Sequence, residues 1–204
     1  MKSVLLTGYD DAMRTIGDMT SPLMERYAET WHMDFQCCRD YPPERHPMWY
    51  KVELVIEAFH DGYDRILWLD ADTIITNQFC SKVMHAGLHI SRDWGEDASE
   101  TDMSTCNFVA FKDTLPLWCL IASHHSNREF GQFHEQGAMR DFYKEHQWVR
   151  DMTTVYPRRV FNAVPQEVGP GIVEPWQKGD WLCHLTNIPN DRRVKLFKKI
   201  TRRT

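Results

Sequence analysis

The sequence has no long hydrophobic run, no CxxC cysteine motif and no excess of positive charge. Because no apolar stretch approaches the ~20 residues of a membrane-spanning helix, and no signal-peptide pattern follows Met1, we expect a cytoplasmic protein without a transmembrane segment. The six cysteines form no CxxC pair, which favours free thiols over a disulfide framework or a zinc site. A net charge of −5 argues against a surface that is basic throughout, as in a general nucleic-acid-binding protein.

The chain also lacks internal repeats, low-complexity tracts and a convincing linker, and its 204 residues suit one domain with a sizeable core. We therefore predict a single domain over residues 1–204. The charge is unevenly distributed, because residues 192–203 read RRVKLFKKITRR while residues 93–102 read DWGEDASETD. We predict a basic C-terminal helix over roughly residues 190–204, either solvated or in contact with an anionic partner, and a lid or acceptor loop from Asp93 to Thr105.

Strand-like and helix-like stretches alternate through the first third of the chain. Ser21 and Pro22 are expected to start the first helix, as its N-cap and first residue, and Pro47 and Gly62 to bound the second. The predicted strands cover residues 2–7, 34–40, 65–69, 87–91 and 105–112, later helices cover 113–125 and 133–146, and residues 158–165 are predicted to be extended. The opening β-α-β-α-β order predicts an α/β fold with a parallel sheet flanked by helices.

Polar residues follow the predicted first and third strands. In parallel sheets ligands bind at the carboxyl ends of the strands, so we expect Thr7, Tyr9 and Asp10 to share a rim with Asp70 and Asp72 and to contact the ligand. Two carboxylates suit Mn²⁺ or Mg²⁺, hard cations that enzymes often hold through one or two acidic side chains and the phosphates of a substrate. Taken alone, the Asp-x-Asp pair fits a solvated loop equally well.

Several stretches, in order along the chain, resemble one family of GT-A glycosyltransferases. They are YAETWHMDF (27–35), HPMWYKVELVIEAF (46–59), ILWLDADTIITN (66–77), NFVAFK (107–112), HEQGAM (134–139), FNAVP (161–165) and PWQKGDWLCHLTN (175–187). The family contains fungal mannan galactosyl- and mannosyltransferases and plant xyloglucan xylosyltransferases. The resemblance extends over roughly residues 3–197, and several ordered motifs are more specific than one acidic pair.

The resemblance implies a GT-A, Rossmann-like fold with a mixed, mostly parallel sheet flanked by helices. It implies metal-dependent, retaining transfer of a hexose or pentose from a nucleotide-diphosphate sugar to a hydroxyl group. On the matching positions it assigns Mn²⁺ (or Mg²⁺) to Asp70, Asp72 and His184, with Asp70 reaching the ion or the ribose. It places Glu135 and Gln136 at the sugar-transfer centre, and the donor contacts it assigns are Lys51, Asp70, Asn107, Gly179 and Asp180; Asn162 also matches.

Two positions depart from the family pattern. Glu135 stands where the family tends to have Asp, and Asn187 stands where it usually has a Gly beside the donor phosphates. The favoured acceptor is a saccharide, and the alternative is hydroxymethylated DNA, which the basic tail would suit. A non-catalytic nucleotide-sugar-binding module is a second alternative, against which the intact acidic and histidine positions argue. A metal-dependent nucleotidyltransferase ranks lower, because TGYDD at residues 7–11 offers one glycine where such enzymes have a Gly-rich loop.

Overall fold

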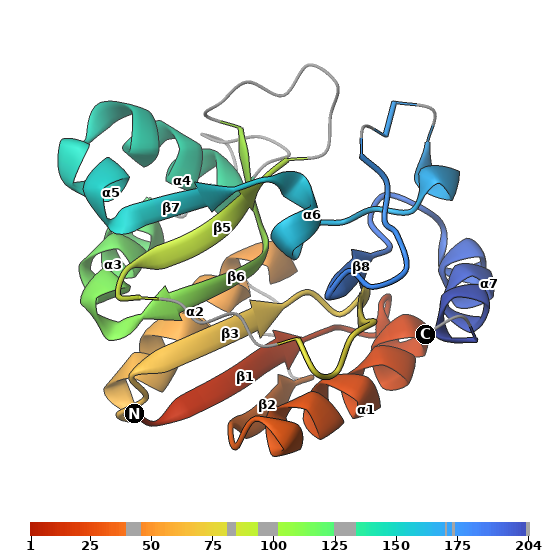
Figure 1. The fold of residues 1–204 in the computed structure, drawn as a ribbon. Coiled ribbons are helices and arrows are strands. Elements are labelled where there is room, and N and C mark those ends of the chain that lie inside the picture. Colours follow the sequence, from red (N-terminus) through yellow and green to blue (C-terminus); the bar gives the residue numbers. More distant parts are fainter. Residues whose placement is uncertain are drawn as a thin grey trace.

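The computed structural model describes residues 1–39, 46–80, 85–93, 102–124, 134–169, 171–172 and 174–202. A six-stranded sheet in the order β2-β1-β3-β6-β5-β7 forms its centre (Figure 1). These strands are β1 (Ser3–Gly8), β2 (Asp34–Cys38), β3 (Arg65–Leu69), β5 (Leu88–Arg92), β6 (Met103–Phe111) and β7 (Thr153–Tyr156). Strands β4 (Thr73–Ile75) and β8 (Leu182–His184) form a separate two-stranded sheet. The helices are α1 (Arg14–Thr30), α2 (Pro47–His60), α3 (Leu115–Ser123), α4 (His134–Glu145), α5 (Gln147–Met152), α6 (Arg158–Phe161) and α7 (Asn190–Thr201).

The large sheet is mixed but mostly parallel, as predicted. Strand β1 runs parallel to both β2 and β3, and β5 runs parallel to β7. Strand β6 is antiparallel to both of its neighbours, β3 and β5, so it alone runs against the other strands of this sheet. This reversed strand places the amino end of β6 beside the carboxyl end of β3, where the acidic pair begins.

Alternating side chains of the central strands fill two apolar layers. Ile66 and Trp68 of β3 face a core built with α2, α3 and α4, whereas Leu67 and Leu69 face a core built with α1, α6 and β8. Figure 1 shows the helices on both sides of the sheet. Successive side chains of a strand point to opposite faces of the sheet. Because both faces of β3 are buried, its sequence is a continuous apolar run.

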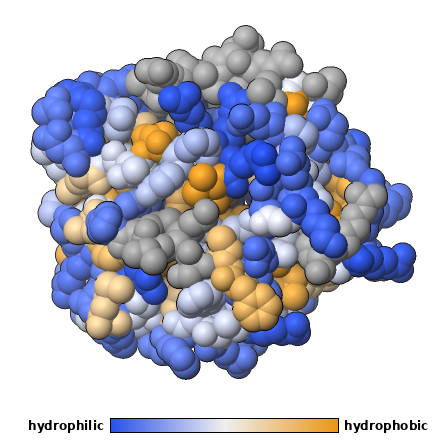
Figure 2. Space-filling model, viewed as in Figure 1, coloured by the Kyte–Doolittle hydropathy of each residue, from blue (hydrophilic) through white to orange (hydrophobic). Residues whose placement is uncertain are grey.

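Helix length, the cysteines and the surface can be compared with the composition. Among the described residues, no helix combines the length and the apolar character needed to cross a membrane. All six cysteines are free thiols, as predicted. Figure 2 shows a mainly hydrophilic face on which apolar groups form small separate patches.

The first helix begins earlier than predicted. It starts at Arg14, and Pro22 lies inside it, so the prediction that Ser21 caps the helix was wrong. Ile16, Thr20 and Met24 are all buried at four-residue spacing, which means that one amphipathic face continues through the proline. The extended segment predicted at 158–165 was also wrong in part, because Arg158–Phe161 form the short helix α6. Strands β4 and β7 and helix α5 were not predicted.

Gly87→Ala is expected to destabilise the fold more than Gly62→Ala. Both glycines have positive φ, +105° at Gly87 and +86° at Gly62, so alanine costs about 1–2 kcal/mol of backbone strain at either position. A Cβ atom at Gly87 would also lie 2.4 Å from the carbonyl oxygen of Met152, whereas one at Gly62 would meet nothing within 4 Å. Urea unfolding of both variants measures the difference, and equal losses of unfolding free energy would contradict this close approach.

Candidate active site

The acidic pair and His184 are brought together by the small sheet. Asp70 follows β3, Asp72 precedes β4, and β4 pairs with β8 so that Thr73 lies opposite His184. The backbone N–H of Thr73 donates to the carbonyl oxygen of Asp70 at 2.9 Å, which closes the turn between the two aspartates. The side chain of Asn107, on β6, secures this turn: its Oδ1 accepts from the Asp70 N–H at 3.1 Å and from the Thr73 hydroxyl at 2.8 Å.

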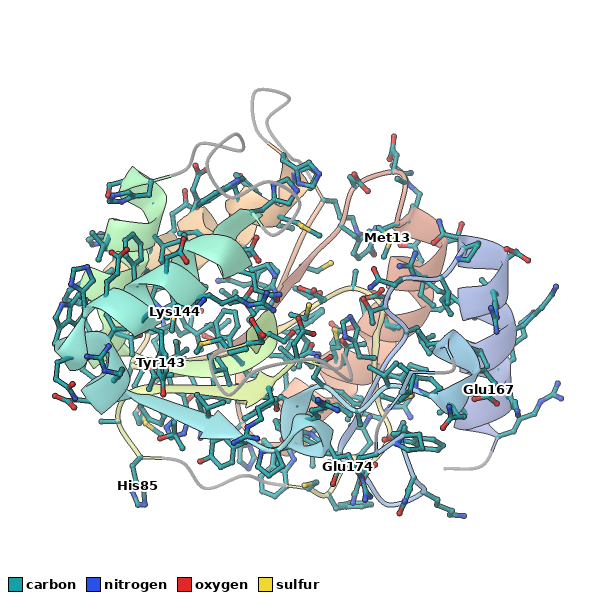
Figure 3. All side chains as sticks on the ribbon, turned by 90° about the horizontal axis from the view of Figure 1, so that it is seen from above. Met13, His85, Tyr143, Lys144, Glu167 and Glu174 are labelled. Carbon is teal, nitrogen blue, oxygen red and sulfur yellow. The ribbon has the colours of Figure 1, made fainter. Side chains whose placement is uncertain are left out.

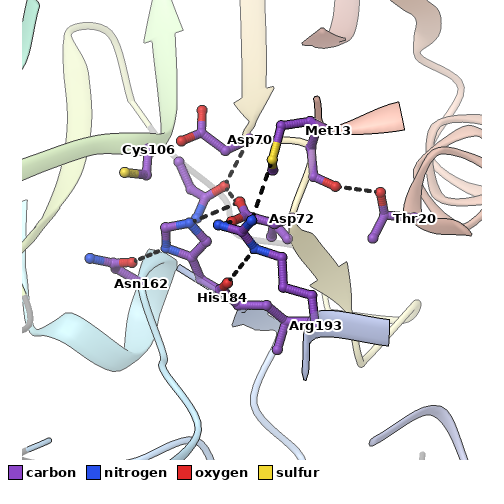
Figure 4. Close-up of polar contacts among 12 residues, drawn as sticks. Met13, Thr20, Asp70, Asp72, Cys106, Asn162, His184 and Arg193 are labelled. Atoms are coloured by element: carbon purple, nitrogen blue, oxygen red, sulfur yellow. Dashed lines mark hydrogen bonds and ion pairs between the residues drawn. The ribbon is translucent and has the colours of Figure 1, made fainter. Parts of the chain in front are cut away.

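Asp72 lies between the side chains of His184 and Arg193 (Figure 4). Its Oδ1 is 3.1 Å from Nε2 of His184, and its Oδ2 is 3.1 Å from a guanidinium nitrogen of Arg193. Burial favours the neutral form of His184, but the charge and hydrogen bond of Asp72 outweigh it, so the pKa of His184 is raised. Burial likewise opposes ionisation of Asp72, yet His184 and Arg193 bring the pKa of its carboxyl below the ordinary value. The structure thus holds a buried carboxylate between an imidazole and a guanidinium group.

Asn162 fixes the orientation of the His184 ring. Nδ1–H of His184 donates to Oδ1 of Asn162 at 2.7 Å, and this leaves Nε2 as the nitrogen that faces Asp72. A histidine that ligates a metal ordinarily donates its other ring N–H to such an oxygen, which sets the tautomer and the direction of the free nitrogen.

Asn162→Ala is expected to weaken Mn²⁺ binding by about 10–100-fold, the usual effect of losing a hydrogen-bond partner of a ligating histidine. The side-chain nitrogen of Asn162 has no partner among the described residues, so the main loss is the contact with His184. Electron paramagnetic resonance of free Mn²⁺ measures the affinity. Asn77→Ala, at a half-buried position that contacts Gly179, is the matched control. Equal affinities in both variants would show that Asn162 does not orient the ligand.

Lys51 joins Asp70 to Glu135 beneath the rim. Its Nζ lies 3.1 Å from Asp70 Oδ1, 3.0 Å from Glu135 Oε1 and 3.0 Å from the carbonyl oxygen of Thr105, so all three N–H donors already have acceptors. Burial disfavours the ammonium, but the charges of Asp70 and Glu135 outweigh it and raise the pKa of Lys51. Lys51 is therefore a charged link between two carboxylates, and donation to a phosphate would replace one of these contacts.

Glu135 and Gln136 lie at the start of α4, against β6. Glu135 is 3% exposed; the hydroxyl of Thr105 donates to its Oε1 at 2.9 Å, and its Oε2 has no partner among the described residues. Burial raises the pKa of the Glu135 carboxyl, with Lys51 opposing the shift. Gln136 accepts from the Thr105 N–H at 3.1 Å and donates to Asp93 at 3.2 Å. Residues 94–101 of the expected lid or acceptor loop lie outside the described residues, so that role stays a prediction.

A cavity of about 360 Å³ opens at the rim where these elements meet. Of the residues predicted for the site, those that line it are Tyr9, Asp10, Lys51, Asp70, Asp72 and His184. Thr7 and Asn107 are buried, each 1% exposed, and are not among its lining residues. Gly179 and Asp180 line a different cavity, where Asp180 pairs with Arg159 at 2.6 Å. Their assignment as donor contacts stays a prediction, and the structure does not bring them to the rim cavity.

Solved structures of sugar transferases share this fold. A glycosyltransferase involved in the glycosylation of the major capsid of PBCV-1 matches with a TM-score of 0.74 at 15% identity, over 98% of this chain and 100% of that chain. The galactosyltransferase LgtC in complex with donor and acceptor sugar analogues matches with 0.63 at 9%, over 97% and 95%. GlyE of Streptococcus pneumoniae TIGR4 matches with 0.61 at 12%, over 98% of this chain and 60% of that chain. The fold is that of a GT-A glycosyltransferase.

By sequence, no family model and no curated protein matches the chain. The GT-A fold predicted from the sequence is therefore confirmed by structure, whereas the resemblance to the fungal and plant family stays a prediction. Within the GT-A fold, the side chains at the rim fit a divalent cation, because two carboxylates and one oriented imidazole nitrogen supply the donor atoms that Mn²⁺ accepts.

Arg193 was missed at the sequence level. The basic tail was considered as one solvated or partner-binding helix, but Arg193 shares the inward face of α7 with Leu196 and Ile200, and its side chain is 14% exposed. It also contacts the sulfur of Met13, and Figure 3 shows Met13 beside α7, with Tyr143 and Lys144 on the opposite side of the molecule. The signal was available: an arginine three and seven residues before apolar residues belongs to the buried stripe.

Proposed function

We propose that this chain is a metal-dependent, retaining glycosyltransferase that moves a sugar from a nucleotide-diphosphate sugar to a hydroxyl group of a saccharide. One observation carries the proposal: Asp70, Asp72 and the oriented His184 converge on a cavity at the rim of a GT-A sheet. We propose further that residues 1–204 act as one domain. The match to LgtC, whose structure holds donor and acceptor sugar analogues, supports a sugar on both sides of the reaction.

The chain's own residues would divide the work of donor binding. Asp70, Asp72 and His184 would hold Mn²⁺ or Mg²⁺, which when bound supplies Lewis-acid neutralisation of the leaving diphosphate. Tyr9 and Asp10, which also line the cavity, would contact the donor. Asn107 lies behind the acidic turn, so its proposed contribution is to keep Asp70 and Thr73 in position.

Glu135 and Lys51 would act on the sugar side. Lys51 keeps Asp70 and Glu135 at a fixed separation, since both carboxylates contact the same ammonium. A buried carboxylate held in this way can stabilise the positive charge that develops on the anomeric carbon as the donor bond breaks. Gln136, already hydrogen-bonded to β6 and Asp93, would position the reacting groups beside it.

A thermal-shift screen of nucleoside diphosphates and nucleotide sugars, with and without Mn²⁺, tests donor binding. A ligand at a hundred times its Kd stabilises the folded state by about 2.7 kcal/mol. For a chain of this size that raises the Tm by roughly 5–10 °C. We expect such a shift for one nucleotide class, enlarged by Mn²⁺. The absence of any shift across the panel would contradict the proposal.

A further inference from the structure

Cys106 lies at the same rim as the acidic pair. The ligand atoms of Asp70, Cys106 and His184 all lie within 4.8 Å of one another, a cluster found among the described residues (Figure 4). Cys106 also lines the rim cavity, and it is a free thiol. Its position was not singled out by the sequence, because a cysteine in a predicted strand carries no signal of its own.

The backbone keeps Cys106 beside Asp70. The carbonyl oxygen of Cys106 accepts from the Asp70 N–H at 3.0 Å, where the reversed strand β6 meets the end of β3. The two side chains therefore start from directly hydrogen-bonded residues. Their separation does not depend on a flexible loop.

The side chains of His184 and Asp70 are also placed to bind a cation. The hydrogen bond from Nδ1–H of His184 to Asn162 leaves Nε2 as the ring nitrogen for a cation, which would replace the 3.1 Å contact of Nε2 with Asp72. Asp70 is the more accessible of the two aspartates, with 25% of its side chain exposed. Asp72, in contrast, has both oxygens engaged by His184 and Arg193. Asp70, Cys106 and His184 thus offer one oxygen, one sulfur and one nitrogen within 4.8 Å of one another.

This donor set differs from the one that Mn²⁺ and Mg²⁺ prefer. Hard cations select carboxylate, carbonyl and water oxygen, whereas a thiolate together with imidazole selects Zn²⁺ and related softer ions. We propose that Asp70, Cys106 and His184 form a binding site for a thiophilic divalent cation such as Zn²⁺. On binding, the Cys106 S–H bond is broken, its proton passes to solvent, and a sulfur–metal bond forms. No oxidant or reductant takes part.

Such binding would inhibit sugar transfer. A cation held by Asp70, Cys106 and His184 uses two of the three side chains proposed for Mn²⁺, so the two ions exclude one another. This consequence rests on the proposed function, whereas the binding of the thiophilic cation does not.

Titration with Co²⁺, a spectroscopic substitute for Zn²⁺, tests the site under anaerobic, reducing-agent-free conditions. Thiolate coordination gives a near-ultraviolet charge-transfer band that oxygen and nitrogen ligands do not. We expect the band in the wild-type chain and in Cys119→Ser, the control at an exposed position of α3, and its loss in Cys106→Ser. A band that persists in Cys106→Ser, or none in the wild type, overturns the proposal.

A second measurement does not require a variant to fold. Zn²⁺ should slow the reaction of Cys106 with a thiol reagent in the wild-type chain, as followed by peptide mass spectrometry, while exposed Cys119 keeps its rate. Equal rates for Cys106 with and without Zn²⁺ overturn the site. Addition of Zn²⁺ to an assay of Mn²⁺-dependent donor hydrolysis then separates the two proposals. A cobalt band in a chain without such hydrolysis would uphold the cation site and contradict the proposed function.

Discussion

Asp72→Asn is expected to abolish Mn²⁺ binding and to reduce donor hydrolysis and sugar transfer by about 10²–10³-fold. The metal is proposed to contribute several kcal/mol of charge stabilisation in the transition state, and each ~1.36 kcal/mol is a factor of ten in rate. The variant removes the carboxylate that lies between His184 and Arg193. Steady-state kinetics over a range of Mn²⁺ concentrations, together with Mn²⁺ binding by electron paramagnetic resonance, measures both effects.

The Asp72→Asn chain should remain folded. His184 can lose its proton, and Arg193 keeps the carbonyl oxygen of Leu185 and the side chain of Asn190 as acceptors, so we expect a loss of about 1–3 kcal/mol of unfolding free energy. Asp141→Asn is the matched control, because it removes the same charge from an exposed position on α4. Turnover equal to that of the wild type in Asp72→Asn would remove Asp72 from the metal site.

Glu135→Gln is expected to lower sugar transfer by about 10²–10⁴-fold, the range for a positioned group that acts in the transition state. Nucleoside diphosphate binding should survive, because Glu135 is not among the residues that line the rim cavity. The amide keeps the size of the side chain and an oxygen for Lys51, which limits the structural effect. Glu135→Ala should show the same kinetic loss with a larger loss of stability, since Lys51 then retains Asp70 as its sole carboxylate among the described residues.

Two comparisons make the Glu135 result specific. Glu145→Gln, exposed at the end of the same helix, should transfer sugar at the wild-type rate. Calorimetric titration with a nucleoside diphosphate should give similar Kd values for Glu135→Gln and the wild type. Unchanged transfer in Glu135→Gln would mean that Glu135 balances the charge of Lys51 and has no part in the reacting centre.

The parallel core was predictable from sequence because its signals are local. The run RILWL, the helix bounded by Pro47 and Gly62, and the acidic pair each follow from neighbouring residues. The start of α1 was not predictable in this way, because a proline at a helix N-terminus is the commoner arrangement and burial of Ile16 against β4 and α7 overrides it. Tertiary packing, and no local pattern, decides that boundary.

In the candidate site, too, some features could be predicted from local sequence and others depend on tertiary packing. The sequence itself indicates Asp70 and Asp72 as a carboxylate pair for a cation, the resemblance adds His184, and the structure brings these three side chains to one cavity. The roles of Arg193 and Cys106 depend on long-range pairing: α7 must dock before Arg193 reaches Asp72, and β6 must run against β3 before Cys106 lies beside Asp70. The spacing of Arg193 from Leu196 and Ile200 indicates a buried face of the helix, but neither contact can be predicted from neighbouring residues. The bonding of Lys51 to two carboxylates at once was hidden for the same reason.

The pairing of β4 with β8 also sets an order of assembly. Strand β7, the last to join the six-stranded sheet, ends at Tyr156, so a chain growing from its N-terminus can complete that sheet before β8 has been made. Asp72 can contact His184 only after the chain has grown by a further 112 residues. The proposed cation site is therefore complete only once β8 has been made, and a cation bound there would stabilise the pairing of β8 with β4.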